Sequence, residues 1–131
     1  MVTTEFRKAQ RDLQERTFCF AKDIRSFVRD LSRSMANIED GKQLIRSSGS
    51  IGANYLEASE AMSKKDAIRI LKICRKESKE SHYWLQLVNT DNQPALEQRR
   101  CALASEAQQF LFIFSSIVSK LTSTAAQTKE P

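Results

Sequence analysis

Apolar residues recur three or four positions apart through almost the whole chain, and this spacing constrains the fold more than any other feature of the sequence. In the first segment, Phe6, Leu13, Phe20 and Phe27 follow one another at intervals of seven residues. Because a helix turns once every 3.6 residues, these side chains share one helix face. Glycine and proline together make up only 5 of 131 residues, too few for the turns of a many-stranded β fold. An all-α domain is therefore predicted.

Breaks in the spacing predict four helices within one domain covering residues 1–131. The helices are expected at about 4–33, 36–62, 64–90 and 95–122, followed by a polar tail at 123–131. Ser63 is expected to cap the third helix, and Pro94 cannot continue it. Helices of similar length joined by short connections predict an antiparallel up-down-up-down four-helix bundle.

The second predicted helix crosses a segment that contains Gly49 and Gly52, and each glycine costs about 1 kcal/mol in a helix interior. The apolar spacing nevertheless continues through it at Leu44, Ile51 and Tyr55. We therefore predict one unbroken helix whose small residues let a neighbouring helix approach closely. Those residues are Ser48, Gly49, Gly52 and Ala53.

The cysteines favour a reducing compartment. Cys19, Cys74 and Cys101 are odd in number and form no Cys-x-x-Cys motif, so neither disulfides nor a zinc site is expected, and the cytoplasm is predicted. The start of the chain lacks the apolar run of a signal peptide. The longest charge-free apolar run, residues 107–119, has 13 residues, so no membrane span is expected.

Positive charge is concentrated on two predicted helix ridges. The chain has 21 Lys and Arg against 16 Asp and Glu, a formal net charge of +5. On the third helix, cations follow one another at 4, 3, 4 and 3 residues, opposite the predicted core: Lys65, Arg69, Lys72, Lys76 and Lys79. The first helix carries a second ridge around Phe18: Arg11, Lys22, Arg25, Arg29 and Arg33. Like charges at such spacings repel by a few tenths of a kcal/mol, so an unbroken basic ridge is mildly unfavourable unless a partner neutralises it.

Three interpretations of these ridges remain open: a solvated face, a nucleic-acid surface, or a surface for an acidic protein. Residues 64–90 carry 7 basic and 3 acidic groups, whereas residues 36–63 carry 2 and 4. Glu57 and Glu60 on the second helix are therefore also candidates to pair with a basic ridge of a neighbouring subunit.

Several large apolar residues lie outside the predicted core stripes. Ile73, Trp84 and Leu87 lie beside the stripe of the third helix, and Phe112 points away from Phe110 and Phe114 on the fourth. An oligomer interface is predicted for them, with a wider core as the alternative.

The sequence gives little support for a catalytic site. His82 is the only histidine, and no glycine-rich loop, acid pair or metal-ligand cluster accompanies it in the sequence. We therefore expect that the protein is not an enzyme and has no cofactor and no metal site. Asn54 and Glu57 lie three residues apart on the second helix, where they either serve function or form a buried polar network. Cys74 is interpreted as a small core residue.

Residues 42–58, with Ser50, Ile51, Asn54 and Glu57 as the most specific positions, resemble a known family. Residues 63–66 and 70–85 are similar to it too, and the resemblance covers about residues 13–120. The family is that of bacterial four-helix bundle proteins first noticed in intervening sequences of large-subunit ribosomal RNA genes and misnamed a ribosomal protein.

This resemblance implies a ring-shaped homopentamer. It further implies a distant kinship with the accessory protein of diversity-generating retroelements, which partners a reverse transcriptase and nucleic acid. For most members of the family no activity is established.

The predicted function is a non-enzymatic homo-oligomer that binds RNA or DNA largely without sequence specificity. The expected binding residues are Lys65, Arg69, Lys72, Lys76, Lys79, Lys22, Arg25 and Arg29. A protein adaptor or scaffold, such as a reverse-transcriptase accessory subunit, is the alternative, and an enzyme ranks third.

Overall fold

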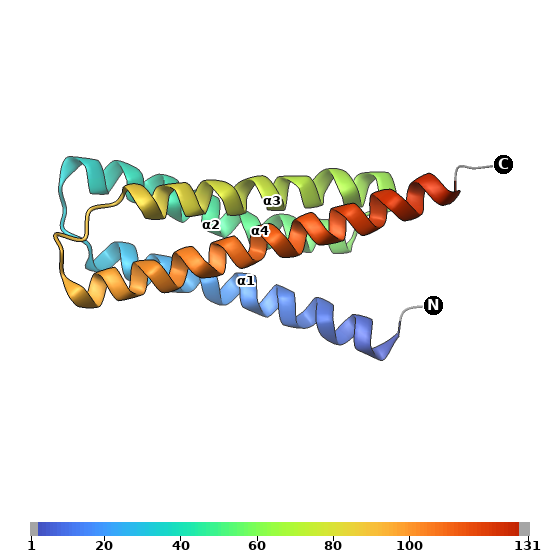
Figure 1. The fold of residues 1–131 in the computed structure, drawn as a ribbon, viewed down its shortest axis with the longest axis horizontal. Coiled ribbons are helices and arrows are strands. Elements are labelled where there is room, and N and C mark those ends of the chain that lie inside the picture. Colours follow the sequence, from blue (N-terminus) through green and yellow to red (C-terminus); the bar gives the residue numbers. More distant parts are fainter. Residues whose placement is uncertain (1–2, 129–131) are drawn as a thin grey trace.

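The computed structural model describes residues 3–128, with side chains described for residues 3–124. Four helices run through this stretch of the chain, which contains no strand: α1 (Thr4–Asp30), α2 (Met35–Ser59), α3 (Lys64–Leu87) and α4 (Pro94–Thr128). Successive helices run in opposite directions, and the α1–α2 and α3–α4 connections lie at the same end of the molecule (Figure 1). The predicted all-α fold of four helices is confirmed.

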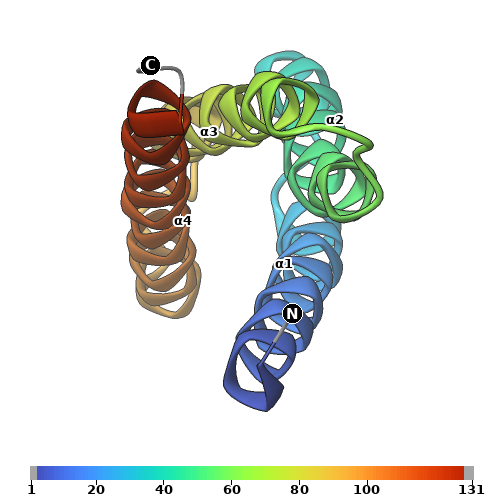
Figure 2. The ribbon, with the colours of Figure 1, turned by 90° about the vertical axis from the view of Figure 1, so that its right-hand side faces the viewer.

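Each helix packs on its neighbours in the sequence, and α1 also contacts α4. Within residues 3–128, no Cα atom of α1 lies within 8 Å of a Cα atom of α3. Figure 2 shows α1 and α4 well apart at the end where the chain begins. Phe6 near that end is therefore 58% exposed, and its predicted place in the core stripe is wrong.

Three helices end earlier than predicted: α1 at Asp30 instead of 33, α2 at Ser59 instead of 62, and α3 at Leu87 instead of 90. The first two stop because the chain must become extended at Ser34 and Ser63, whose side chains cap the next helices. The hydroxyl of Ser34 accepts from the backbone N–H of Asn37 at 3.1 Å, and that of Ser63 from the N–H of Asp66 at 3.1 Å.

Met62 lies in the α2–α3 connection and is 95% exposed, so it does not continue the core stripe as predicted.

The last helix is longer than predicted. Helix α4 continues to Thr128, past the expected end at 122, because no glycine or proline interrupts residues 123–128. Residues 129–131 of the expected tail lie outside the described residues.

The core is built from all four helices around a group of aromatic rings. The rings of Phe20 and Phe110 meet edge to face with centroids 5.3 Å apart, and those of Tyr55 and Phe114 lie 5.8 Å apart. Fully or almost fully buried aliphatic and small residues surround them: Ile24, Leu44, Ile51, Leu71, Cys74, Leu85 and Ala107. This core fixes the position of α3 against α4.

By length and composition, one segment among the described residues, Pro94–Thr124, would suffice to cross a membrane. The sequence analysis expected no membrane span because it considered only the charge-free run at residues 107–119 within this segment. The most apolar 18-residue window of this segment includes the core residues Phe110 and Phe114, and 28% of that window is buried inside the bundle. The core helix of a soluble bundle passes the same test, so this is weak evidence for a membrane.

Helix α2 runs without interruption through both of its central glycines, and the two glycines have different surroundings. A Cβ atom on Gly52 would lie 3.0 Å from the Oγ1 atom and 3.3 Å from the Cβ atom of Thr17 on α1. Thr17 is fully buried and its hydroxyl donates to the carbonyl of Leu13 or Gln14. At Gly49 the same atom would meet only the flexible end of the Arg25 side chain, at 3.4 Å. The close approach of α1 and α2 thus depends on Gly52 and not on Gly49.

Gly41, which sequence analysis did not single out, has the same role as Gly52 nearer the beginning of α2. A Cβ atom there would lie 2.9 Å from Cγ1 of Val28, a branched side chain with little freedom to move away. Helix α1 is therefore held against α2 at two points, Thr17 on Gly52 and Val28 on Gly41.

We predict that the substitutions Gly52→Ala and Gly49→Ala change stability in opposite directions. Gly52→Ala overpacks the Thr17 contact and should lower the free energy of unfolding by about 1–3 kcal/mol, less the gain in helix propensity. Gly49→Ala should raise it by up to about 1 kcal/mol. Urea unfolding followed by circular dichroism measures both, and a Gly52→Ala protein more stable than Gly49→Ala would contradict the packing argument.

Candidate nucleic-acid interface

A groove of about 460 Å³ lies between α3 and α4, and its charged lining is entirely basic. Helix α3 contributes Lys72, Arg75, Lys76 and Lys79, and α4 contributes Leu111 and Ser115. The four cations follow one another at positions i, i+3, i+4 and i+7, which places them along one side of the helix. The groove therefore presents a row of positive charge along about two helical turns.

No acidic side chain forms an ion pair with the groove lysines within the described residues. Lys72, Lys76 and Lys79 are exposed and form no ion pair with any described residue. Their charges are thus available to an external anion. Arg75 is half-buried and also lines the groove. Sequence analysis missed it, because its side of α3 faces a groove only once the position of α4 is known.

The rest of the predicted α3 ridge lies outside the groove. Lys65 is exposed near the beginning of α3, and Arg69 forms an exposed ion pair with Asp66 at 3.5 Å. Two acids directly follow groove lysines in the sequence, Glu77 after Lys76 and Glu80 after Lys79, and both are half-buried. Burial raises the pKa of Glu77, nearby Glu80 raises it further, and Lys76 opposes the shift. Glu77 does not line the groove, although it follows Lys76 directly.

The predicted α1 cations lie apart from the groove, because the Cα atoms of α1 and α3 do not come within 8 Å of each other in the described residues. Lys22 lies over the ring of exposed Phe18, with Nζ 5.7 Å from the centroid. The guanidinium of Arg25 donates to the carbonyl of Ala21, and that of Arg29 donates to the hydroxyl of Ser26. The two predicted ridges therefore do not form a single binding surface within one chain (Figure 2).

The predicted interface residues also divide between two faces. Trp84 is half-buried and packs against the core, and Ile73 is half-buried on the same helix. Leu87 is 49% exposed at the end of α3, and Phe112 is 60% exposed on α4. Leu87 and Phe112 are thus available to a partner, whereas Trp84 already contributes to the fold.

The polar pair singled out on α2 does not form a buried network. The amide of half-buried Asn54 donates to the carbonyl of Ser50 at 2.8 Å, one turn earlier in its own helix. Glu57 and Glu60 are exposed and have no ion-pair partner among the described residues. The expectation of a polar network is therefore wrong, while both glutamates remain available to another molecule.

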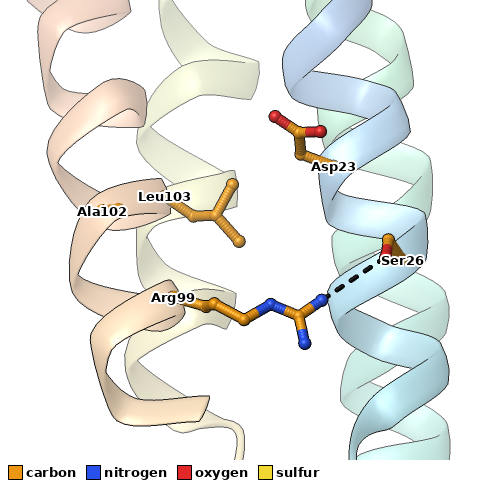
Figure 3. Close-up of a pocket in the computed structure, with 5 residues that line it drawn as sticks. All are labelled: Asp23, Ser26, Arg99, Ala102 and Leu103. Atoms are coloured by element: carbon orange, nitrogen blue, oxygen red, sulfur yellow. Dashed lines mark hydrogen bonds between the residues drawn. The ribbon is translucent and has the colours of Figure 1, made fainter. Parts of the chain in front are cut away.

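A second hollow, of about 320 Å³, lies between α1 and α4 (Figure 3). Its lining includes Asp23, Ser26 and Arg99. The Arg99 guanidinium is already engaged, since it pairs with Asp30 at 2.8 Å, reaches the Ser26 hydroxyl at 3.4 Å and lies 5.7 Å from the Phe27 ring centroid. This arginine joins α1 to α4 and is not arranged to bind a substrate.

The described side chains include no group of three His, Cys, Asp or Glu residues placed to hold a metal ion. His82 is half-buried on α3 without a hydrogen bond or ion pair to any described residue. The basic groove is therefore the candidate site in residues 3–124 whose charged side chains form no ion pair.

Comparison with known proteins agrees with this architecture. Residues 10–111 match the family of 23S rRNA-intervening sequence proteins. The chain belongs to this family. It is also similar to the crystal structure of a protein of unknown function from the S23 ribosomal protein family of Bacteroides thetaiotaomicron. The two chains are 28% identical, the match covers 80% of this chain and 96% of the other, and the TM-score is 0.69.

No curated protein matches the sequence. Family membership establishes the ancestry and the four-helix fold of the chain, and it confirms the resemblance found in the sequence. It assigns no activity, because a fold shared by descent does not identify a site.

The three cysteines of this family member differ in their surroundings, which gives a test of the core around the groove. Cys19 and Cys101 are exposed, whereas Cys74 is buried, with its thiol 3.6 Å from the carbonyl oxygen of Ile51. Burial raises the pKa of Cys74 to about 12. The Cys74 thiolate is therefore scarce at neutral pH.

We predict that two thiols react promptly with a disulfide reagent in the native protein and that the third reacts only after denaturation. The reaction is followed by absorbance with and without urea, and a Cys74→Ala variant should lose only the slow thiol. Three prompt thiols in the native parent would show that α3 is not packed on α2 as described.

Proposed function

We propose that the protein binds RNA or DNA through the groove between α3 and α4, as a non-enzymatic homo-oligomer of the cytoplasm. The observation that carries the proposal is the groove lining, with four cations and no acid. Phosphate groups of a nucleic-acid backbone supply negative charge at regular intervals, and each contact releases condensed counterions. Since the groove residues are Lys, Arg, Leu and Ser, with no arrangement that reads base edges, binding is expected to tolerate any sequence.

Assembly into an oligomer would increase the overall affinity of a site that binds weakly on its own. A ring repeats the same groove in every subunit, so one nucleic-acid strand contacts several grooves at a high effective concentration. Ring assembly requires two different faces on each subunit, because every contact joins one face to another. The two exposed members of the predicted interface would meet this requirement, since Leu87 lies on α3 and Phe112 lies on α4. Exposed Glu57 and Glu60 on α2 would meet basic residues of the next subunit.

Protein adaptor function is the second candidate. It is favoured by large apolar side chains outside the core on α1 and α2, among them Phe6, Met35 and Leu56. Exposed apolar residues commonly mark contacts with another polypeptide. Absence of binding to any RNA or DNA at low salt would leave this function in first place.

We predict that replacing the four groove cations with glutamine abolishes nucleic-acid binding. For four phosphate contacts, affinity of the parent should fall about 100-fold between 50 and 200 mM salt. The variant Lys72→Gln/Arg75→Gln/Lys76→Gln/Lys79→Gln should show no binding at either salt concentration, because its counterion release is gone. Fluorescence anisotropy with a labelled oligonucleotide measures both quantities.

The matched control removes the same number of charges from α1: Arg11→Gln/Lys22→Gln/Arg25→Gln/Arg29→Gln. It should retain most of the affinity, because these side chains lie on a separate surface. Equal losses in the two variants would show that net charge, and not the groove, determines binding. Unchanged binding by the groove variant would place the site elsewhere.

We further predict that the purified protein has a mass well above 15.0 kDa. Phe112→Glu should reduce that mass while the helical content is unchanged, since a buried interface anchor contributes about 2 kcal/mol or more. Phe6→Glu, which also charges an exposed apolar position, is the control. Light scattering gives the mass, and a monomeric parent at micromolar concentration would exclude the assembly.

A further inference from the structure

An exposed aromatic ring continues the row of groove cations along α3. Tyr83 follows Lys79 by four residues and Lys76 by seven, so all three share one helix face. At 1.5 Å per residue, Tyr83 lies about 10 Å beyond Lys76 along the helix axis. The ring is 57% exposed, and its hydroxyl has no hydrogen-bond partner among the described residues.

Tyr83 is held in place by the neighbouring ring. The centroids of Tyr83 and Trp84 lie 5.1 Å apart with an interplanar angle of 77°, an edge-to-face arrangement. Trp84 packs against the core, so it anchors the pair. An edge-to-face pair occupies at most one face of a ring, which leaves Tyr83 with a free face. A fixed, exposed ring beside a row of cations is the combination that binds unpaired bases.

We propose that Tyr83 stacks on an unpaired base of single-stranded nucleic acid whose phosphates bind Lys76 and Lys79. The inference rests on the proposed function of the groove and narrows its ligand to single strands. In a duplex both faces of each base are covered by the neighbouring bases, so Tyr83 gains nothing from it. A single strand offers an open base within reach of the ring, and stacking tolerates every base because each has a π face.

The chain contains a matched control and a built-in reporter. Phe18 is 62% exposed beside Lys22 on α1, an equally accessible ring among cations on a surface that does not touch α3. Trp84 is the single tryptophan of the sequence, and its ring contacts Tyr83. A base that stacks on Tyr83 should therefore change the intrinsic tryptophan fluorescence.

The experiment measures affinity of the full chain for labelled oligo(dT), oligo(U) and a duplex of the same length at one low salt concentration. The parent is expected to bind both single strands more tightly than the duplex. Tyr83→Ala should weaken binding to both single strands about five-fold or more and leave the duplex unchanged. Tyr83→Phe and Phe18→Ala should retain parent affinity. Trp84 fluorescence should respond to single strands only.

The outcomes separate this inference from the proposed function. Binding of the parent to neither strand form would overturn both. Unchanged single-strand affinity in Tyr83→Ala, or a loss confined to one of the two oligonucleotides, would overturn the stacking role alone. An equal loss for single strands and duplex, or a changed mass by light scattering, would also overturn it, since Tyr83 would then act through the fold or the assembly.

Discussion

The buried side chain of Asn37 ties together the two connections at one end of the bundle, and the placement of α4 depends on this contact. Its amide donates to the carbonyl of Asn89 at 2.9 Å and to that of Ser32 at 3.1 Å, while its carbonyl accepts from the backbone N–H of Asn89 at 2.8 Å. Asn89 follows soon after α3, so Asn37 fixes where the chain leaves that helix. Beyond it, Arg100 donates to the carbonyl of Val88 at 2.7 Å and holds the beginning of α4 to the same end. The relative position of α3 and α4, and hence the groove, follows from these polar contacts together with the aromatic core.

The apolar spacing was sufficient to predict the number, order and approximate bounds of the helices, because each helix has one stripe that must be buried. It was insufficient at the open end of the bundle. Phe6 keeps the seven-residue spacing but is exposed, since no neighbouring helix covers that end of α1. Helix ends were predicted less well: the cap at Ser63 was expected, but the cap at Ser34 was not, because the apolar spacing carries no information on capping residues. Asn37 gave no signal at all, because its partner Asn89 lies 52 residues away and the contact depends on the fold.

The site was predictable only as a set of residues on one helix. Helical periodicity placed Lys72, Lys76 and Lys79 together, which requires no knowledge of other helices. The inclusion of Arg75 and the exclusion of Lys65 required the position of α4, since the groove exists only where the two helices meet. Trp84 shows that periodicity on a single helix was also insufficient to separate core residues from interface residues. Its position beside the core stripe suggested an interface, and the structure shows that it also packs on the core, because a large ring covers more of a helix surface than one wheel position indicates.

The charged side chains of the groove take no part in the ion pairs that stabilise the fold. None of the groove lysines stabilises the bundle through an ion pair with a described residue, and neighbouring like charges on a helix each cost a few tenths of a kcal/mol. The acids of the chain do form such pairs elsewhere: Glu106 binds the Arg16 guanidinium at 2.7 Å and Asp30 binds that of Arg99. Those pairs join α1 to α4, where the helix contact is otherwise small. Two acidic side chains thus connect α1 to α4, whereas the α3–α4 groove, which is held together by its core, has only positive charges in its lining. A phosphate backbone in that groove would remove the repulsion without disturbing any contact on which the fold depends.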